Sequence, residues 1–336
     1  MEEFGLNLDE TRLMFSLQYF LTLRDVRDTR DRKYQNIKKQ WLQSFQNSTE
    51  LFLSNQAKQQ QQPSFDCHLI TDTETLLNRV RNIKKTPGSQ LTKLFILLEV
   101  TLFVPYYSLQ SSQDSQYEKL KLSDSHIKNK YCQSLAKAMG LPPDCVQRFQ
   151  ENYKKAMEGI SGQWTNLLGG GLVGGLLLVV ATAFFTPAIA ALLAPILAPG
   201  LSGAAAVSAV LAALGGGAIA AGGFGMAGGF AVLVAGGAIL GGGAGAGMGS
   251  LLARSPDAAL TQAAKLEVVM KELVDVQQDI RKAQEIIKEQ RQAIRSLEDK
   301  LDELLVDKKK NKEKIENLKK AIKYLQEALK RNRDLL

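Results

Sequence analysis

The most conspicuous feature of this sequence is an absence of charge. Between Glu158 and Arg254 there is no Asp, Glu, Lys, Arg or His, which leaves 95 residues, 159–253, without an ionisable side chain. The surface of a soluble globular domain needs charged residues in contact with water, so this stretch cannot form one. It holds 25 of the 28 glycines, but they do not recur at every third position as collagen requires. Its spacers are Leu, Val, Ile, Ala and Phe, which excludes a flexible Gly/Ser linker.

Residues that carry catalysis or bind metals are also scarce. His68 and His126 are the only histidines, and neither has the spacing of a metal-binding motif. The pentapeptide GLSGA at 200–204 lacks the final glycine of a serine nucleophile elbow. A phosphate-binding loop requires a lysine directly after its last glycine, and no lysine follows the glycine runs of this chain. We therefore expect no enzyme activity, no cofactor and no metal ion.

We also expect no disulfide framework and no secretory signal. The three cysteines are odd in number and scattered, which gives no disulfide framework and favours a reducing compartment. The start MEEFGLNLDE is acidic, whereas a signal peptide begins basic and continues apolar. The net charge of +8 is divided about equally between 1–158 and 254–336. We interpret it as surface charge facing anionic lipid at most, and we expect no nucleic-acid partner.

Residues 1–158 have the pattern of a soluble helical domain. Asn7 or Asp9 can cap a first helix, and the charged run RDVRDTRDRK that follows is expected to be a solvated helix face. The apolar run 94–104 is too short to cross a bilayer and is predicted to be the central core helix. Two further helices are expected at about 123–139 and 143–160, separated by a stop at Gly140.

The charge-free stretch has the length for two to four membrane crossings, because ~20 apolar residues span a bilayer. Its most hydrophobic part is 166–186, and prolines break the chain after it. Beyond the prolines, small residues recur every four positions, as in membrane helices that pack closely. Composition alone would also fill many such positions with Gly or Ala. The residues predicted to pack membrane helices are Gly171, Gly175, Gly217, Gly225, Gly229, Gly237, Gly241, Gly245 and Gly249.

Residues 254–336 carry a heptad repeat in one unbroken phase, which predicts a long coiled coil. A polar layer at Lys308 and Asn311 leaves two interpretations, a continuous helix or the turn of a helical hairpin. The identical phase on both sides favours the continuous helix. Whether the seam meets a second copy or the chain's own N-terminal helices stays open. The seam residues predicted are Leu273, Ile280, Ile287, Ile294, Leu301, Ile315, Ile322 and Leu329.

One stretch resembles a known family. The helix pair KYCQSLAKAMGLPPDCVQRFQENYKKAMEG at 130–159, then Trp164, GGGLVGGLLL and GLSGAAAVSAVLAALGGGAIAAGGFGMAGG, resembles the membrane part of the transmembrane-and-coiled-coil hydrolase family, domain of unknown function 726. The helix pair is also similar to the TerB-like domain of tellurite resistance. Members of that hydrolase family carry a G-x-S-x-G serine after the membrane part, where this chain has heptads, so no catalytic residue transfers. The overall plan is similar to that of α-helical pore-forming toxins.

Together these features predict an all-α protein: a soluble helical domain at 1–158, a membrane-inserting region at 159–253 and a coiled coil at 254–336. The function expected is that of a lipid-inserting protein that forms homo-oligomers through its coiled coil and makes a pore or perturbs a membrane. A constitutive anchor that tethers a partner is the alternative, and a degenerate hydrolase using Ser202 is a third. Basic residues flank both ends of the region, which predicts cytoplasmic soluble parts and an even number of crossings.

Overall fold

The computed structural model describes residues 6–59, 62, 64–83, 90–106, 114–117, 120–162, 256–309 and 311–336. All regular structure among these residues is helical, as the sequence predicts, and no strand occurs in them. Described residues fall into two compact units. The N-terminal unit holds 6–150, and the C-terminal unit holds 151–162 together with 256–336. The division falls inside one helix, α7, and each unit is described by itself below.

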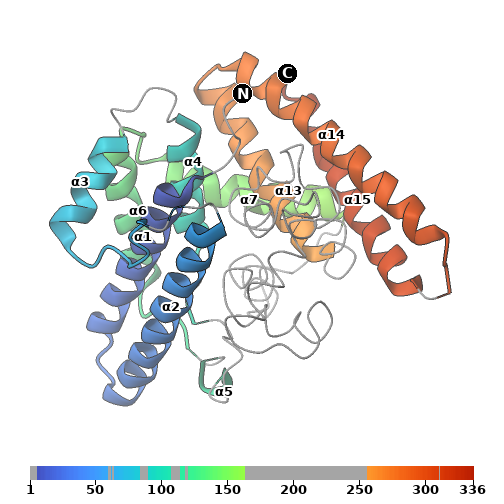
Figure 1. The fold of residues 1–336 in the computed structure, drawn as a ribbon. Helices are drawn as coiled ribbons and strands as arrows, with labels where there is room; N and C mark the ends of the chain where they lie inside the picture. Colours follow the sequence, from blue (N-terminus) through green and yellow to red (C-terminus); the bar gives the residue numbers. More distant parts are fainter. Residues whose placement is uncertain are drawn as a thin grey trace. The chain divides into compact units, whose positions relative to one another are not determined.

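The N-terminal unit is an assembly of packed helices of different lengths (Figure 1). Helix α1 packs against α2, α3 and α4, and α6 packs against α3 and α4. The short α5 lies against α2. The helices are α1 (Leu8–Asp28), α2 (Arg32–Gln59), α3 (Thr73–Ile83), α4 (Gln90–Leu102), α5 (Asp114–Tyr117), α6 (Ser125–Met139) and the first part of α7 (Cys145–Ser161).

Local sequence signals explain where several of these helices begin and end. The Asn7 side chain accepts a hydrogen bond from the Glu10 amide, and the Glu10 carboxylate accepts one from the Asn7 amide, which closes a capping box before α1. Gly140 ends α6 in the left-handed conformation at φ 76°, which glycine adopts without a steric penalty. Every residue of α4 from Lys93 to Leu102 is buried, so the predicted core helix is confirmed.

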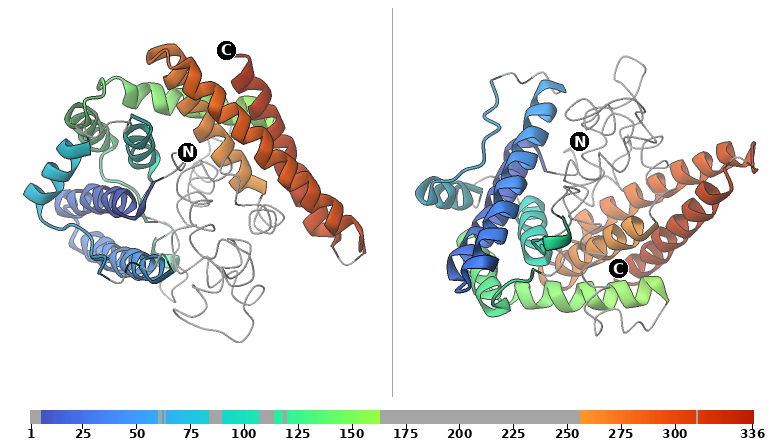
Figure 2. Two further views of the ribbon diagram at one scale, coloured as in Figure 1. Left: turned by 45° about the horizontal axis from the view of Figure 1, so that its top comes forward. Right: turned by 90° about the horizontal axis from the view of Figure 1, so that it is seen from below.

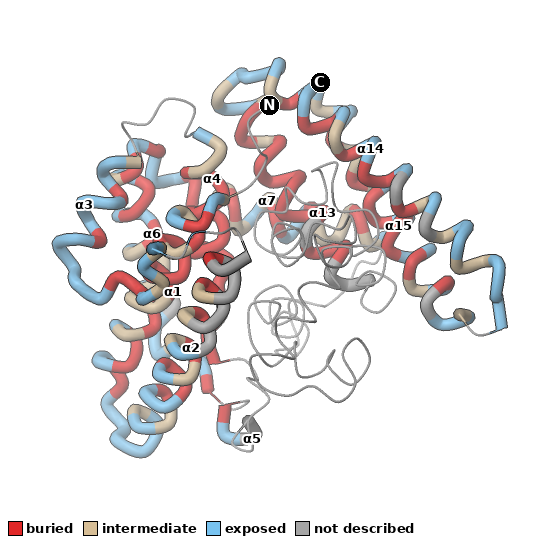
Figure 3. The backbone as a smooth tube through the Cα atoms, in the orientation of Figure 1, coloured by how far each residue is buried: buried red, intermediate tan, exposed pale blue. Residues whose placement is uncertain are grey.

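Aromatic side chains fill the core of this unit. Trp41 is stacked on Phe45 with 5.3 Å between ring centroids, and it meets Tyr106 edge-on at the same separation. Phe45 also contacts Phe15 and Phe103. These five rings come from α1, α2 and the segment after α4, so they tie together parts of the chain that are distant in sequence. Figure 3 shows the buried residues along the inward faces of these helices.

The C-terminal unit is built on three successive helices that reverse direction twice (Figures 1 and 2). Helix α13 (Pro256–Lys271) continues into a short π-helix, η4 (Glu272–Val276), and α14 (Ile280–Leu305) then runs back. After a turn at 306–311, α15 (Lys312–Arg333) returns along both α13 and α14. Helix α15 therefore lies antiparallel to α14 and parallel to α13.

The prediction of one continuous coiled-coil helix is wrong, and the hairpin is the arrangement found. Leu301 and Ile315 occupy the same heptad position two repeats apart. The heptad that contains the polar residues Lys308 and Asn311 forms the turn between α14 and α15. Because this turn takes the place of one whole heptad, the heptad positions continue in the same phase in α15. A heptad pattern reports which face of a helix is apolar, but it does not report whether the chain reverses between two repeats.

A second break precedes α14. Helix α13 widens into the π-helix η4, and Gln278 then adopts φ 55°, a left-handed conformation that is uncommon outside glycine. The Asp279 side chain caps the new helix by accepting a hydrogen bond from the Lys282 amide. Because the chain changes direction here, Val276 and Ile280 leave the seam and are 44% and 41% exposed.

Apart from that break, the predicted seam coincides with the buried face. Seven of the eight residues predicted for the seam are shielded, and Ile280 is exposed. Leu273, Ile287, Ile294, Ile315 and Ile322 are buried, and Leu301 and Leu329 are half-buried.

One buried polar pair lies within the hairpin. Asn332 donates a hydrogen bond to the Gln290 side chain at 3.1 Å, and Gln290 donates one to the Leu325 carbonyl at 3.3 Å. Both amide side chains are fully buried. Since an unpaired buried amide is costly, this pair favours the alignment of α14 and α15 that brings the two together.

No helix of the described residues has the length and apolar character to cross a membrane. The membrane-embedded helices predicted within 159–253 fall almost entirely outside the described residues, which stop at Gly162 and resume at Pro256.

The hairpin can be tested by cross-linking cysteines introduced as Glu298→Cys and Gln326→Cys in a Cys67→Ser background. These two side chains share a 2.8 Å hydrogen bond although they are 28 residues apart. In a continuous helix they would be about 42 Å apart. We expect mild oxidation to give an intramolecular disulfide, seen as a faster monomer band on a non-reducing gel.

The matched control has the same sequence separation but different positions, Arg291→Cys with Lys319→Cys. In the hairpin these positions are about 20 Å apart along the helices, so they should not cross-link within one chain. Equal yields for the two pairs, or cross-links only between chains, would contradict the hairpin.

Candidate functional site

The glycines predicted to pack membrane helices, at 171–249, lie outside the described residues. The described residues that border the charge-free stretch are Gly159 at the end of α7 and the helices α13 to α15 that follow it. A cluster of four residues joins these segments. We call it the Arg331 cluster, and it consists of Gly159, Glu267, Lys271 and Arg331.

Two cations hold the carboxylate of Glu267 at the centre of this cluster. Arg331 donates two hydrogen bonds to it, from Nε to Oε2 and from Nη2 to Oε1, each 2.7 Å long. Lys271, one turn further along α13, pairs with Oε1 at 2.9 Å. The Glu267 side chain is 1% exposed, whereas that of Arg331 is 30% exposed. A buried carboxylate needs such partners, because its desolvation would otherwise oppose folding.

Gly159 is in close contact with the opposite side of the Arg331 guanidinium. A Cβ added at Gly159 would lie 2.6 Å from Cζ of Arg331, closer than real side chains approach. The lack of a side chain at Gly159 therefore leaves room for the Arg331 guanidinium in this position. Through Arg331, the residue that opens the charge-free stretch is linked to Glu267 on the helix that follows the stretch.

The pKa of Glu267 follows from these contacts. Burial by itself raises the pKa of the carboxyl group, but the hydrogen bonds and charges of Arg331 and Lys271 outweigh burial and hold the pKa below its ordinary value of 4.5. The same hydrogen bonds raise the pKa of Arg331. Glu267 and Arg331 therefore keep their charges at neutral pH.

Sequence reasoning missed this cluster. Glu267 and Arg331 are 64 residues apart, and each resembles a solvated charge beside an apolar heptad position. Only the reversal of the chain between α14 and α15 brings them together. A search for oppositely charged residues that a predicted hairpin would bring together could have identified Glu267 and Arg331.

A second charged network lies in the N-terminal unit. Asp25 and Lys38 are 5% and 3% exposed, and Lys38 Nζ is 2.5 Å from Asp25 Oδ2. Asp25 also accepts hydrogen bonds from the Ser123 amide at 2.6 Å and from the Tyr106 hydroxyl. Lys38 further donates to Ser123 Oγ at 2.9 Å and to Thr29 Oγ1 at 3.1 Å. This network joins α1, α2 and the segments after α4 and before α6.

The run RDVRDTRDRK matches its prediction as a solvated helix face only in part, because most of its charged residues are exposed but Asp25 is buried. The run is not one helix, because α1 ends at Asp28 and α2 begins at Arg32. Asp25 is buried and pairs with Lys38 on the next helix. The reason is geometric: Asp25 lies on the face of α1 that also carries the buried Leu21.

Tyr106 carries strain in this network. Its φ of 70° is left-handed, which a bulky residue adopts only when its surroundings hold it. Burial raises the pKa of the Tyr106 hydroxyl, and so do its hydrogen bond to Asp25 and the charge of that carboxylate. The phenol therefore stays protonated and donates. The network is fully satisfied from within the unit and is interpreted as structural.

A lysine of α6 has an altered basicity. Lys128 Nζ donates a 2.6 Å hydrogen bond to the Phe103 carbonyl, and burial lowers the pKa of Lys128 to about 8. Cys132 lies one turn further along α6, and burial raises the pKa of its thiol. Among the described residues, no group of three or more His, Cys, Asp or Glu side chains has the arrangement of a metal site.

Comparisons with known proteins add no relative. No family model, no curated protein and no solved structure matches this chain. The resemblance to the transmembrane-and-coiled-coil family and to the TerB-like domain stays a prediction from the sequence.

The contact between Gly159 and Arg331 can be tested with a double-mutant cycle. Gly159→Ala should lower the free energy of unfolding, because its Cβ meets the guanidinium. In an Arg331→Met background the same change should cost less, with a coupling of about 1–2 kcal/mol. Chemical denaturation of the four proteins measures this coupling. Additive effects of the two changes would show that α7 and α15 do not touch at this point.

The charge of Glu267 can be tested by its pH dependence. A carboxyl group whose pKa is lowered by folding stabilises the protein above its unfolded pKa, and it loses this contribution as pH falls through the folded pKa. The melting temperatures of the native protein and Glu267→Gln should therefore differ by a constant amount from about pH 8 to about pH 5. Below about pH 4 the difference should shrink. A difference that already disappears at about pH 6 would contradict the lowered pKa.

Proposed function

We propose that this chain is a membrane-inserting helical protein that oligomerises to form a pore or to perturb a membrane. The observation that carries the proposal is the stretch 159–253, whose 95 residues contain no ionisable side chain. In water such a sequence must be shielded, whereas in a bilayer it needs no charge. The span 166–186 is long enough to cross as a helix.

The arrangement of the flanking helices supports insertion from one side. Residues 151–162 and 256–336 belong to the same compact unit, and Arg331 links Gly159 to Glu267 within it. A chain that leaves one folded unit and returns to it keeps both ends on one face of a membrane. We therefore propose an even number of crossings, with the soluble parts in the cytoplasm.

The structure changes which surface we propose for oligomerisation. The predicted seam residues Ile287, Ile294, Ile315 and Ile322 are buried within one chain by the packing of α13, α14 and α15. They are not available to join two copies while the hairpin is intact. We therefore assign oligomerisation to the small residues recurring every four positions in 205–249, which allow close packing of helices in a bilayer.

A constitutive membrane anchor is the second candidate. The low polar content of 159–253 favours it, since the polar residues there are a few Ser, Thr, Asn and Gln. Water-filled pores usually present more polar or charged side chains. Both functions place the region in the membrane. They differ in whether solutes cross it.

Dye release from liposomes distinguishes the two candidates. The native protein should release dye, and Leu177→Asp, at the centre of 166–186, should reduce release on the order of 100-fold, because a carboxylate at the bilayer centre costs about 3 kcal/mol. The matched control is Leu77→Asp, the same change at a position on α3 that is 37% exposed. It should release dye like the native protein.

Carbonate extraction of the same membranes completes this experiment. Protein that resists extraction but releases no dye over a range of lipids would identify an anchor. Protein that is extracted and inactive would exclude both functions.

A further inference from the structure

We propose that the turn between α14 and α15 is a docking element for an anionic lipid surface. The hairpin tip is defined by Val306, Asp307, Lys308, Lys309 and Lys312. This inference deepens the proposed function and rests on it in one respect, that a membrane is the partner. It adds which lipids are recognised and which part of the chain meets them first.

An apolar side chain projects from this tip. Val306 is 88% exposed, whereas the other exposed large hydrophobic side chains of the described residues are at most 48% exposed. It follows the last residue of α14, where the chain turns (Figure 3). An apolar side chain at the extremity of a helical hairpin can enter the boundary between lipid headgroups and acyl chains, where its exposure to water ends.

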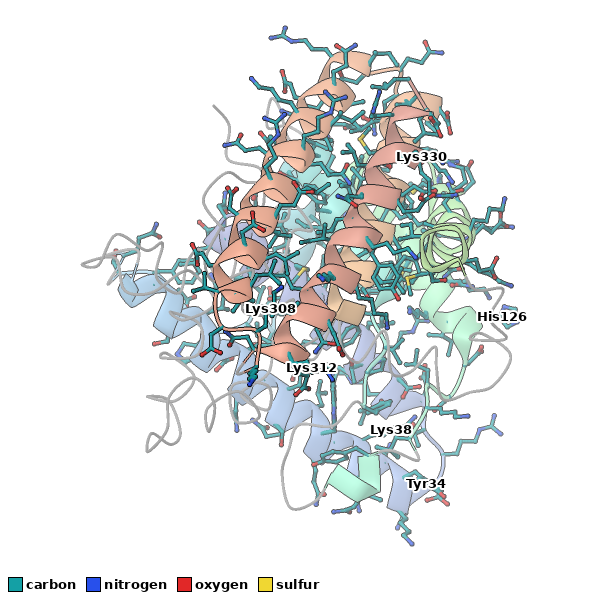
Figure 4. All side chains as sticks on the ribbon, turned by 90° about the vertical axis from the view of Figure 1, so that its right-hand side faces the viewer. Tyr34, Lys38, His126, Lys308, Lys312 and Lys330 are labelled. Atoms are coloured by element: carbon teal, nitrogen blue, oxygen red, sulfur yellow. The ribbon has the colours of Figure 1, made fainter. Side chains whose placement is uncertain are left out.

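Several lysines follow Val306 in the sequence. The side chains of Lys308, Lys309 and Lys312 are exposed, and Figure 4 shows Lys308 and Lys312 at the same end of the hairpin. Between 306 and 312 the sequence has four lysines and one aspartate, a local charge of +3. A cluster of lysines beside an apolar side chain matches an anionic lipid surface, which attracts the ammonium groups while the apolar group inserts.

The tip carries a local excess of positive charge, although α15 has further exposed lysines along its side. Asp302 and Glu303, one turn back on α14, are exposed and negative. If the hairpin approaches a negative surface with its tip first, Lys308 and Lys309 come closer to that surface than these carboxylates do. A flat membrane can be met in this way, whereas a polyanion lying along the helices would meet charges of both signs.

The hairpin is built to hold the tip away from the rest of the unit. Helix α15 separates Lys312 from Arg331 by 19 residues, about 29 Å. The buried contacts of α14 and α15, with the hydrogen bond between Gln290 and Asn332, fix the two helices against each other. The tip is therefore presented at one end of a stiff two-helix arm.

A fluorophore that senses polarity, attached at position 306, tests the contact directly. The full-length chain carries Val306→Cys in a Cys67→Ser background, since the other two cysteines are fully buried. Vesicles of phosphatidylcholine with about 30% phosphatidylserine should shift the emission to the blue, and vesicles of phosphatidylcholine alone should not. The matched control is Val276→Cys, an exposed valine at the opposite end of α14, which should not respond.

Charge removal at the tip provides the second arm. Lys308→Gln with Lys309→Gln should weaken binding to the phosphatidylserine vesicles about 25-fold, because each lysine at an anionic surface contributes about five-fold. Lys319→Gln with Lys323→Gln removes the same charge from exposed positions on the side of α15. This control should change binding by less than about three-fold, which is less than the effect expected of a single lysine at the membrane surface.

The outcomes separate this inference from the proposed function. A silent label at 306 with phosphatidylserine vesicles, or equal effects of the two lysine pairs, overturns the docking element even if dye is released. A label that responds at 306 and lysine effects confined to the tip support it, even where the dye assay shows no pore.

Discussion

The C-terminal unit depends on one requirement, that the buried carboxylate of Glu267 be paired. Nothing in an apolar interior compensates an isolated carboxylate, so Glu267 is tolerated only where Arg331 and Lys271 reach it. For Arg331 to do so, α15 must run back beside α13, which requires the turn at 306–311. The Arg331 guanidinium also lies beside Gly159, where a Cβ would meet it. The hairpin, the packing of α13 and the position of the end of α7 are thus mutually consistent.

The helices themselves were largely predictable from the sequence, because their signals are local. Asn7 and Gly140 mark a beginning and an end through hydrogen bonds and backbone conformations of neighbouring residues. The apolar run of α4, interrupted only by Glu99 and Thr101, indicated a core helix. The direction of the chain after Leu305 was not predictable in this way, since the apolar face of α15 has the same phase whether the chain continues or reverses. Reversal is decided by contacts with α13, which lie far away in sequence.

The candidate site was less predictable, and charge is the reason. Asp25 and Glu267 both occur among other charged residues and have the appearance of surface positions. Each carboxylate is buried because a cation on another helix forms an ion pair with it. Lys38 pairs with Asp25, and Arg331 pairs with Glu267. Composition and periodicity do not contain that information. A glycine such as Gly159, inside a sequence where glycine is abundant, gives no sign that its missing side chain makes room for a guanidinium.

The two ends of α15 bear on how insertion could be controlled. Arg331, near the C-terminal end, keeps its pair with Glu267 at mildly acidic pH because the pKa of Glu267 is lowered. Acidification as in an endosome therefore does not release Gly159 through this cluster. The other end of α15 begins at the lysines of the hairpin tip, and the helix between them is stiff. If contact with anionic lipid moves α15 relative to α13, the contact between Gly159 and Arg331 changes as well, because Arg331 is part of α15.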